Sequence, residues 1–190
     1  MTFDFAAARQ KMVDCQVRPS DVTDLTIVDA MGSVARETLC APGKAALAYA
    51  DLEPPSASGR FLMRPRDVAK LLQALRPRPG ERALAIAAPY AAAVLEAMGL
   101  VVDRLDGEDL SSPPRGGYDV AICEGAVAMV PRGWLSALGA GGRLAVVERT
   151  GPVGKARLYA ASESGSACRE LFDSTPPILP QFEPKPQFAF

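Results

Sequence analysis

Residues Glu81–Ala97, ERALAIAAPYAAAVLEA, contain the pattern that decides the fold. The apolar run at residues 83–86 is followed by a tight turn, Ala87-Ala88-Pro89, and then by an alanine-rich segment that favours a helix. Such a succession is typical of the first βα unit of a nucleotide-binding α/β sheet. Glycines normally occupy this turn, because they let the backbone approach a ligand and leave N–H groups free at the helix N-terminus. Here the turn contains no glycine.

The composition predicts one globular domain with an ordinary core. The chain has 190 residues, of which 48% are hydrophobic and 23% are charged, and its formal net charge is -1. This charge argues against a main role in binding nucleic acid or an anionic membrane. The N-terminal residues lack the apolar segment of a signal peptide, and no apolar run approaches the roughly 20 residues that span a bilayer. We therefore expect a cytoplasmic protein.

The absence of histidine removes several kinds of site. Without it the chain has no Ser-His-Asp or Cys-His nucleophile and none of the usual zinc sites. The cysteines are scattered and form no CxxC pair, which indicates reduced thiols in a cytosolic protein. We expect no metal site, and any acid–base chemistry would fall to carboxylates, lysine, tyrosine or cysteine.

Helix and loop signals precede residue 81, and strand signals follow it. Apolar spacing predicts a helix over Phe3–Val17, a second helix capped by Thr23 or Asp24, and a third that begins near Pro65. The buried face of the second helix is expected to contain Leu25, Ile27, Val28 and Met31. Later apolar runs alternate with helical segments, which predicts a mostly parallel sheet. Its strands are expected at residues 83–86, 100–102, 118–122, 143–147 and 155–161, and residues 188–190 could close the sheet.

Five segments carry a family resemblance. Residues 8–42 read ARQKMVDCQVRPSDVTDLTIVDAMGSVARETLCAP, and residues 59–75 read GRFLMRPRDVAKLLQAL. Residues 117–131, 138–151 and 168–182 read GYDVAICEGAVAMVP, LGAGGRLAVVERTG and CRELFDSTPPILPQF. In residue type and order these segments resemble the protein-L-isoaspartate O-methyltransferase family, which uses S-adenosylmethionine to methylate the stray carboxylate of damaged aspartyl residues. The resemblance implies a single domain, residues 1–190, with a Rossmann-like methyltransferase-type sheet over residues 81–190. Residues 1–80 would form a helical N-terminal cap and the substrate-loop segment.

The resemblance fails first at the cofactor turn. In the family the first strand runs into a Gly-x-Gly-x-Gly turn that holds the cofactor, and here that turn is about two residues shorter. The residues at its place are Ala87, Ala88, Pro89 and Tyr90. Each replaced glycine adds a Cβ or excludes positive φ, and Pro89 also removes an N–H donor. These residues are a vestigial cofactor site at best, or simply a packed turn between a strand and a helix.

A second departure follows the second strand. Asp106 stands where the family has the acid that binds the cofactor ribose, although an acid in a loop is often merely solvated. The family then has a helix, a further strand and a loop that holds the adenine. The connection Asp106–Tyr118 is too short for a crossover helix and a strand. We therefore expect a sheet one edge strand short, with Asp103 and Arg104 placing charges on the new edge.

A third departure lies on the substrate side. The family's serine or threonine aligns with Met63, whose thioether cannot replace a hydroxyl donor. The resemblance therefore implies no catalytic residue here. Nearby cations could attract a carboxylate or could form an ordinary solvated face; they are Arg60, Arg64, Arg66 and Lys70.

Three altered parts of one active site favour a protein that has lost catalysis. On this hypothesis the chain binds no cofactor and acts as a binding module for an unknown protein partner or a second copy of itself, through its N-terminal helices or the new sheet edge. The alternative is an active isoaspartyl methyltransferase that holds S-adenosylmethionine in a rebuilt pocket, since methyl transfer mostly needs positioning. Nucleic-acid binding would rest only on the basic cluster Arg60–Arg78, and we expect neither nucleic acid nor membrane as a partner.

Overall fold

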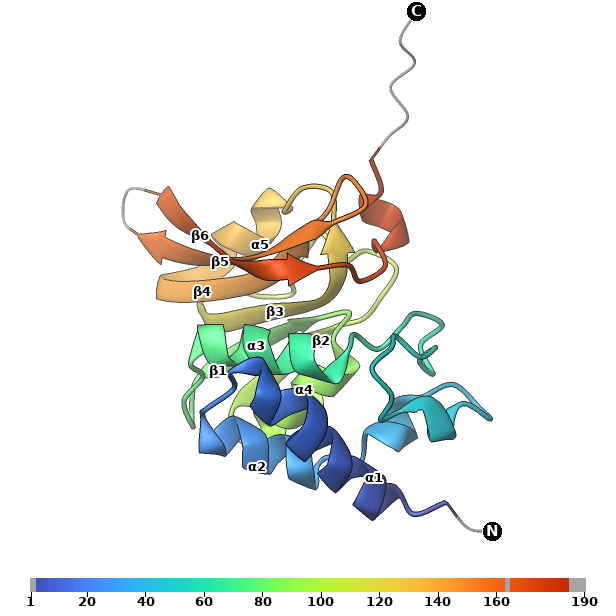
Figure 1. Cartoon of the computed structure of the whole chain (residues 1–190). Helices are drawn as coiled ribbons and strands as arrows, with labels where there is room; N and C mark the ends of the chain where they lie inside the picture. Colours follow the sequence, from blue (N-terminus) through green and yellow to red (C-terminus); the bar gives the residue numbers. More distant parts are fainter. Residues whose placement is uncertain (1–2, 163–164, 185–190) are drawn as a thin grey trace, which may run out of the picture.

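The computed structural model describes residues 3–162 and 165–184, which form a mixed sheet with helices packed against it (Figure 1). Within these residues the sheet has six strands in the order β2-β1-β3-β4-β5-β6. The strands are β1 Arg82–Ile86, β2 Val101–Leu105, β3 Tyr118–Val127, β4 Leu138–Glu148, β5 Gly154–Ser162 and β6 Gly165–Ser174. Strands β1 to β4 pair in parallel with one another, whereas β5 is antiparallel to both of its neighbours, β4 and β6.

The central strands face two separate hydrophobic cores. In β1, Ala83 and Ala85 pack into one core, and Leu84 and Ile86 pack into the other. Because parallel strands with both faces covered need apolar residues at every position, the continuous run predicted for residues 83–86 becomes a buried strand. The first core lies under the N-terminal helices, and the second contains Trp134.

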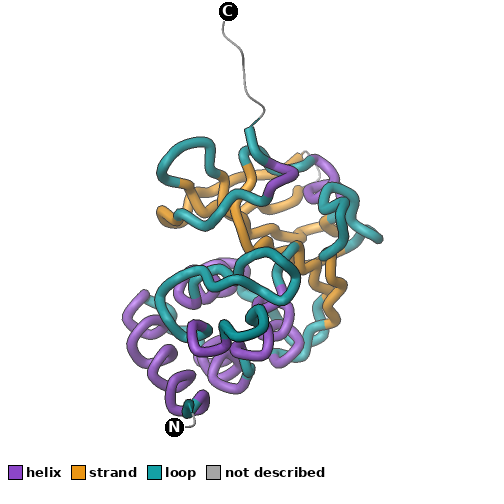
Figure 2. Tube along the Cα trace, turned by 90° about the vertical axis from the view of Figure 1, so that its right-hand side faces the viewer, coloured by secondary structure: helices purple, strands orange, loops and turns teal. Residues whose placement is uncertain are grey.

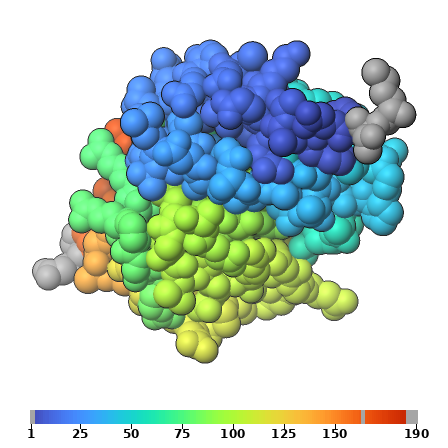
Figure 3. Space-filling model, turned by 90° about the horizontal axis from the view of Figure 1, so that it is seen from below, coloured from blue at the N-terminus to red at the C-terminus, as the bar shows by residue number. Residues whose placement is uncertain are grey.

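Most helices lie in two layers on one face of the sheet, and the short helix that contains Trp134 lies on the other face. The α-helices are α1 Phe5–Met12, α2 Leu25–Ser33, α3 Pro65–Leu75, α4 Pro89–Ala97 and α5 Arg132–Ser136. Figure 2 shows the N-terminal helices gathered below the strands, and Figure 3 shows the N-terminal segment lying beside α4. Since α2 contacts α3 and α4, which contact the sheet, α2 belongs to an outer helical layer, whereas α3, also within the expected cap of residues 1–80, packs directly on the sheet. No helix in the described part of the chain is both long and apolar enough to cross a bilayer.

Helix α2 begins as predicted but buries a different set of residues. Asp24 caps it, because its carboxylate accepts the N–H of Thr26 (2.9 Å). The prediction that Leu25 belongs to the buried face is wrong: Leu25 is the first helical residue, and 63% of its surface is exposed. The buried residues are Ile27, Val28, Ala30 and Met31.

The short connection after β2 contains no strand between residues 106 and 117, all of which are described, so the missing edge strand is confirmed. Strand β2 is therefore an edge strand, as expected. Its charges have partners: Asp103 accepts the Tyr118 hydroxyl (2.9 Å), and Arg104 pairs with Glu96 (2.9 Å). The indole N–H of Trp134 donates to the carbonyl of Leu110 (2.6 Å) and holds the connection against the second core.

Strand β6 was not predicted from the sequence. Most of its side chains are exposed, so it lacks the alternation of apolar and polar residues that marks a half-buried strand. It pairs antiparallel with β5 along its whole length, from the Gly154–Ser174 pair to the Ser162–Gly165 pair. The predicted strand at residues 188–190 lies outside the described residues.

Candidate functional site

The turn between β1 and α4 retains the backbone shape of a glycine turn without the glycine. Ala87 has a φ of 47°, in the left-handed region that a Cβ disfavours. Its N–H donates to the carbonyl of Leu105 (2.9 Å), and its methyl group is buried. Ala88 is also buried and makes no side-chain cap, while Pro89 is the first residue of α4.

A buried carboxylate lies at the N-terminus of α4. Glu124, near the carboxyl end of β3, is only 2% exposed. Its Oε1 accepts the N–H of Ala91 (2.6 Å), and its Oε2 accepts the N–H of Met63 (3.3 Å). Because the free N–H groups of a helix N-terminus favour an anion, Glu124 acts as an internal ligand of α4.

Arg36 and Tyr90 complete the group, which we call the buried polar cluster (Arg36, Tyr90 and Glu124). The Arg36 guanidinium lies 4.4 Å from the centre of the Tyr90 ring. Arg36 also donates from Nε to the carbonyl of Ala48 (2.8 Å) and from Nη2 to the carbonyl of Met63 (2.7 Å). Within the described residues, the Tyr90 hydroxyl and Arg36 Nη1 have no hydrogen-bond partner.

Burial perturbs the ionisation of all three groups in the buried polar cluster. Loss of solvation lowers the pKa of Arg36 and raises the pKa of Tyr90. The pKa of Glu124 is also raised by burial, an effect that the positive charge of Arg36 and the N–H donors of Ala91 and Met63 partly offset. Each charge in the cluster therefore depends on its partners.

The other predicted site residues lie at different distances from this cluster. Met63 is buried, and its main chain links Glu124 to Arg36. Asp106 is exposed, and its main-chain carbonyl accepts two hydrogen bonds from Arg60 (3.1 Å each). Of the predicted site residues, Tyr90 therefore belongs to the buried polar cluster and Met63 contacts it through its main chain. The Asp106 side chain lies at the surface.

Sequence reasoning missed Arg36 and Glu124. Glu124 did leave a signal, because it is the only charge among residues 120–127, the otherwise apolar part of β3. Nothing in the sequence near Arg36 distinguishes it from the surface arginines.

Beside Glu124 lies a cavity of about 100 Å³. It is lined by Gly59, Arg60, Phe61, Met63, Glu124, Gly125 and residues 176–180. Gly125 has a φ of 136°, and a Cβ there would lie 3.0 Å from the side chain of Leu179, so the close approach of that segment requires glycine. In the described residues, no group of three or more His, Cys, Asp or Glu side chains could hold a metal ion.

Comparison with solved structures identifies the fold class. A chain described as a protein-L-isoaspartate O-methyltransferase superposes with a TM-score of 0.71 at 18% identity and covers 90% of this chain and 65% of its own. A Plasmodium falciparum protein assigned to the same activity and solved with S-adenosyl-L-homocysteine gives a TM-score of 0.71 at 14% identity, over 94% of this chain and 99% of its own. The protein therefore has the Rossmann-like fold of S-adenosylmethionine-dependent methyltransferases.

Comparison with curated sequences identifies the family. The protein-L-isoaspartate O-methyltransferase 1 of Rhodopseudomonas palustris is 30% identical over 205 aligned positions, which cover 89% of this chain and 81% of the relative. The enzyme of that name from Methylorubrum populi is 44% identical over 95 residues, 49% of this chain. The chain spans about half the length of that relative and of another from Methylorubrum extorquens, 45% and 46% respectively. No family model matches. The chain belongs to the protein-L-isoaspartate O-methyltransferase family.

Proposed function

We propose that this member of the family does not bind S-adenosylmethionine, does not transfer methyl groups and acts as a protein-binding module. The observation that carries the proposal is the buried carboxylate of Glu124 at the N-terminus of α4. In the family, the turn that begins this helix holds the amino-acid end of the cofactor, which carries a carboxylate of its own. Glu124 already uses the N–H of Ala91, and its negative charge opposes a second anion at the same place.

The space around Glu124 supports the same proposal. Tyr90 and Arg36 are both fully buried next to the turn, and the cavity beside Glu124 has a volume of about 100 Å³. Sites for small molecules usually measure about 300–1,000 Å³. Met63 offers a thioether in place of a hydroxyl donor, and the Asp106 side chain is at the surface. The residues present therefore do not fit the cofactor.

Calorimetric titration of the purified protein with S-adenosylmethionine, and separately with S-adenosylhomocysteine, should detect no binding tighter than a dissociation constant of about 1 mM, equivalent to about -4 kcal/mol. Losing two or more hydrogen-bonding contacts of about 1–3 kcal/mol each accounts for this weakness. An active methyltransferase titrated in parallel controls for the quality of the ligand.

The alternative function is that of an active isoaspartyl methyltransferase. Two observations favour it: the left-handed φ of Ala87 preserves the backbone of a glycine turn, and Asp106 follows β2 where the family has its ribose-binding acid. Saturable micromolar binding, together with transfer of labelled methyl to an isoaspartyl peptide, would establish this alternative and refute the loss of function.

Replacing Ala87 by glycine tests whether the missing glycine of the turn is by itself enough to prevent cofactor binding. The variant Ala87→Gly should unfold within about 1 kcal/mol of the parent, because relief of the left-handed strain offsets the greater freedom of glycine in the unfolded chain. It should bind S-adenosylmethionine no more tightly than the parent, since Glu124 and Tyr90 remain in place. Chemical denaturation and calorimetry measure both quantities, and recovery of micromolar binding would show that the missing glycine alone had abolished the site.

The binding role we propose has two candidate surfaces. Leu25 on α2 and Val101 on the edge strand β2 are 63% and 62% exposed, respectively. A partner protein or a second copy of the chain would bury one of these apolar side chains.

A further inference from the structure

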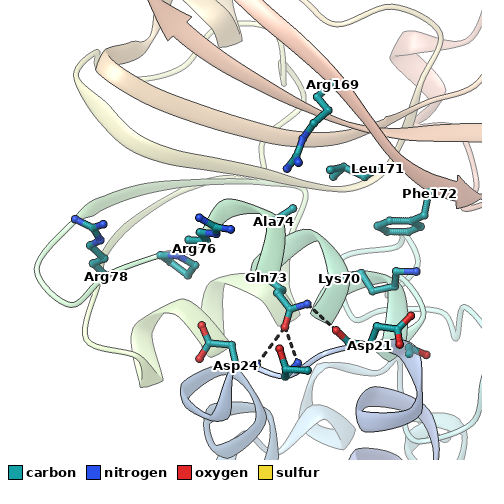
Figure 4. A pocket seen from close by; sticks show the side chains of 13 residues that line it. Asp21, Asp24, Lys70, Gln73, Ala74, Arg76, Arg78, Arg169, Leu171 and Phe172 are labelled. Atoms are coloured by element: carbon teal, nitrogen blue, oxygen red, sulfur yellow. Dashed lines mark hydrogen bonds between the residues drawn. The ribbon is translucent and has the colours of Figure 1, made fainter.

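A groove of about 670 Å³ lies between the start of α2, the C-terminal half of α3 and β6 (Figure 4). It is near the end of the sheet at which β1 begins, whereas Glu124 lies at the opposite, carboxyl end of the parallel strands. Its apolar surface comes from Ala74, Pro77, Leu171 and Phe172. Its volume is within the range of ligand sites.

Four cationic side chains line this groove: Lys70, Arg76, Arg78 and Arg169. We call them the groove cations. Within the part of the chain that the structure describes, none of the four forms an ion pair. Lys70 instead lies 4.4 Å from the centre of the Phe172 ring. The nearby carboxylate of Glu81 pairs with Arg143 (3.0 Å).

The fold divides the basic cluster that the sequence indicated over Arg60–Arg78. Arg60 donates to the main-chain carbonyls of Asp106 and Gly107, and Arg64 pairs with Glu53 (2.8 Å). Arg66 pairs with Asp51 (3.7 Å) and Asp67 (3.4 Å). The other three cations of this segment, Lys70, Arg76 and Arg78, line the groove, where β6 adds Arg169 from the far end of the sequence. In Figure 4, Arg169 points from β6 toward α3.

We propose that this groove binds an acidic, extended segment of a partner protein. Unpaired positive charges that converge on one hollow attract a ligand of opposite charge. The apolar surface of Leu171 and Phe172 suits an aliphatic or aromatic side chain of the same segment. In addition, β6 is the outermost strand of the described sheet, so an extended segment beside it finds unpaired main-chain groups.

The opposite wall of the groove favours a peptide over a nucleic acid. Asp21 and Asp24 lie there, and Figure 4 shows both below Gln73. Their carboxylates repel a continuous phosphate backbone, whereas a peptide can place its acidic residues on the cationic side only. This inference gives the binding role proposed above a third candidate surface, the groove, and a partner class; it rests on the groove residues and not on the loss of the cofactor.

The test is fluorescence anisotropy with a labelled peptide of glutamates interrupted by leucines, at low and at physiological ionic strength. The parent should bind this peptide more tightly at low salt. The variant Arg78→Glu/Arg169→Glu should bind it about tenfold more weakly or worse, because two attractive charges become repulsive. Arg76 is left unchanged, since its left-handed φ of 50° ends α3 and its carbonyl accepts a hydrogen bond from Arg143.

The matched control is Arg115→Glu/Arg132→Glu, which makes the same charge change at two exposed arginines outside the groove. It should weaken binding by less than about twofold if the effect is local. Equal weakening by both variants, absence of salt-dependent peptide binding by the parent, or tighter binding of a single-stranded oligonucleotide would each overturn the proposal. Self-association that Arg78→Glu/Arg169→Glu abolishes would assign the groove to a second copy and also overturn it. Calorimetry of the parent with S-adenosylmethionine reports separately on the proposed function, because the two sites lie at opposite ends of the sheet.

Discussion

Replacing Glu124 by glutamine should lower the free energy of unfolding by about 3–5 kcal/mol, the usual cost of removing one partner from a buried charged group. The substitution changes little volume, so it creates no large cavity. It leaves the Arg36 guanidinium buried without the negative charge that offsets its loss of solvation. It also turns an amide N–H₂ toward the N–H of Ala91 or of Met63, where two donors meet. Urea denaturation followed by circular dichroism measures the effect.

A double-mutant cycle tests whether Arg36 and Glu124 act together. Arg36→Met alone should also be destabilising, since Ala48 and Met63 lose donors to their carbonyls. If the buried polar cluster is one unit, Arg36→Met/Glu124→Gln should cost at least about 1 kcal/mol less than the sum of the single variants. Strict additivity would mean that the two side chains do not interact and that the buried polar cluster is not one unit.

The variant Ile86→Ala should cost about 2–5 kcal/mol of folding free energy. Ile86 is fully buried in β1, a strand paired on both sides, and it belongs to the core that contains Trp134. The loss combines the transfer energy of the deleted methylene and methyl groups with the cost of the cavity left behind. Thermal and urea denaturation of the parent and the variant give the difference.

Val101→Ala is the matched control for this prediction. Val101 is the first residue of β2, it is 62% exposed, and its replacement should change stability by no more than about 0.5 kcal/mol. If Ile86→Ala melts within a degree or two of the parent, or if the two variants cost the same, β1 is not the central buried strand that the fold requires.

The structure gives a physical reason why the turn between β1 and α4 lacks the glycines of a cofactor site. The missing glycines indicated only that the cofactor turn was altered. The structure adds Glu124, which accepts the N–H of Ala91 at the start of α4, and Arg36, which lies against the ring of Tyr90. Our proposal of lost cofactor binding therefore depends on groups that are present as well as on groups that are absent.

The sequence by itself determined the parts of this protein whose signals are local. The apolar run at residues 83–86, the cap expected at Thr23 or Asp24 and the proline that starts α3 each depend on neighbouring residues. The structure confirms the strand and the proline, and it assigns the cap to Asp24. The length of the Asp106–Tyr118 connection likewise limited the sheet to one strand fewer, because a crossover needs a minimum of chain.

Only the tertiary structure decided the features that bring distant residues together. Strand β6 has little apolar pattern of its own and depends on its pairing with β5. The buried polar cluster joins residues 36, 90 and 124, and the groove cations join α3 to Arg169. In each case an exposed-looking polar residue acquires its role from burial or from a neighbour far along the chain, and that role is a property of packing that no local spacing encodes.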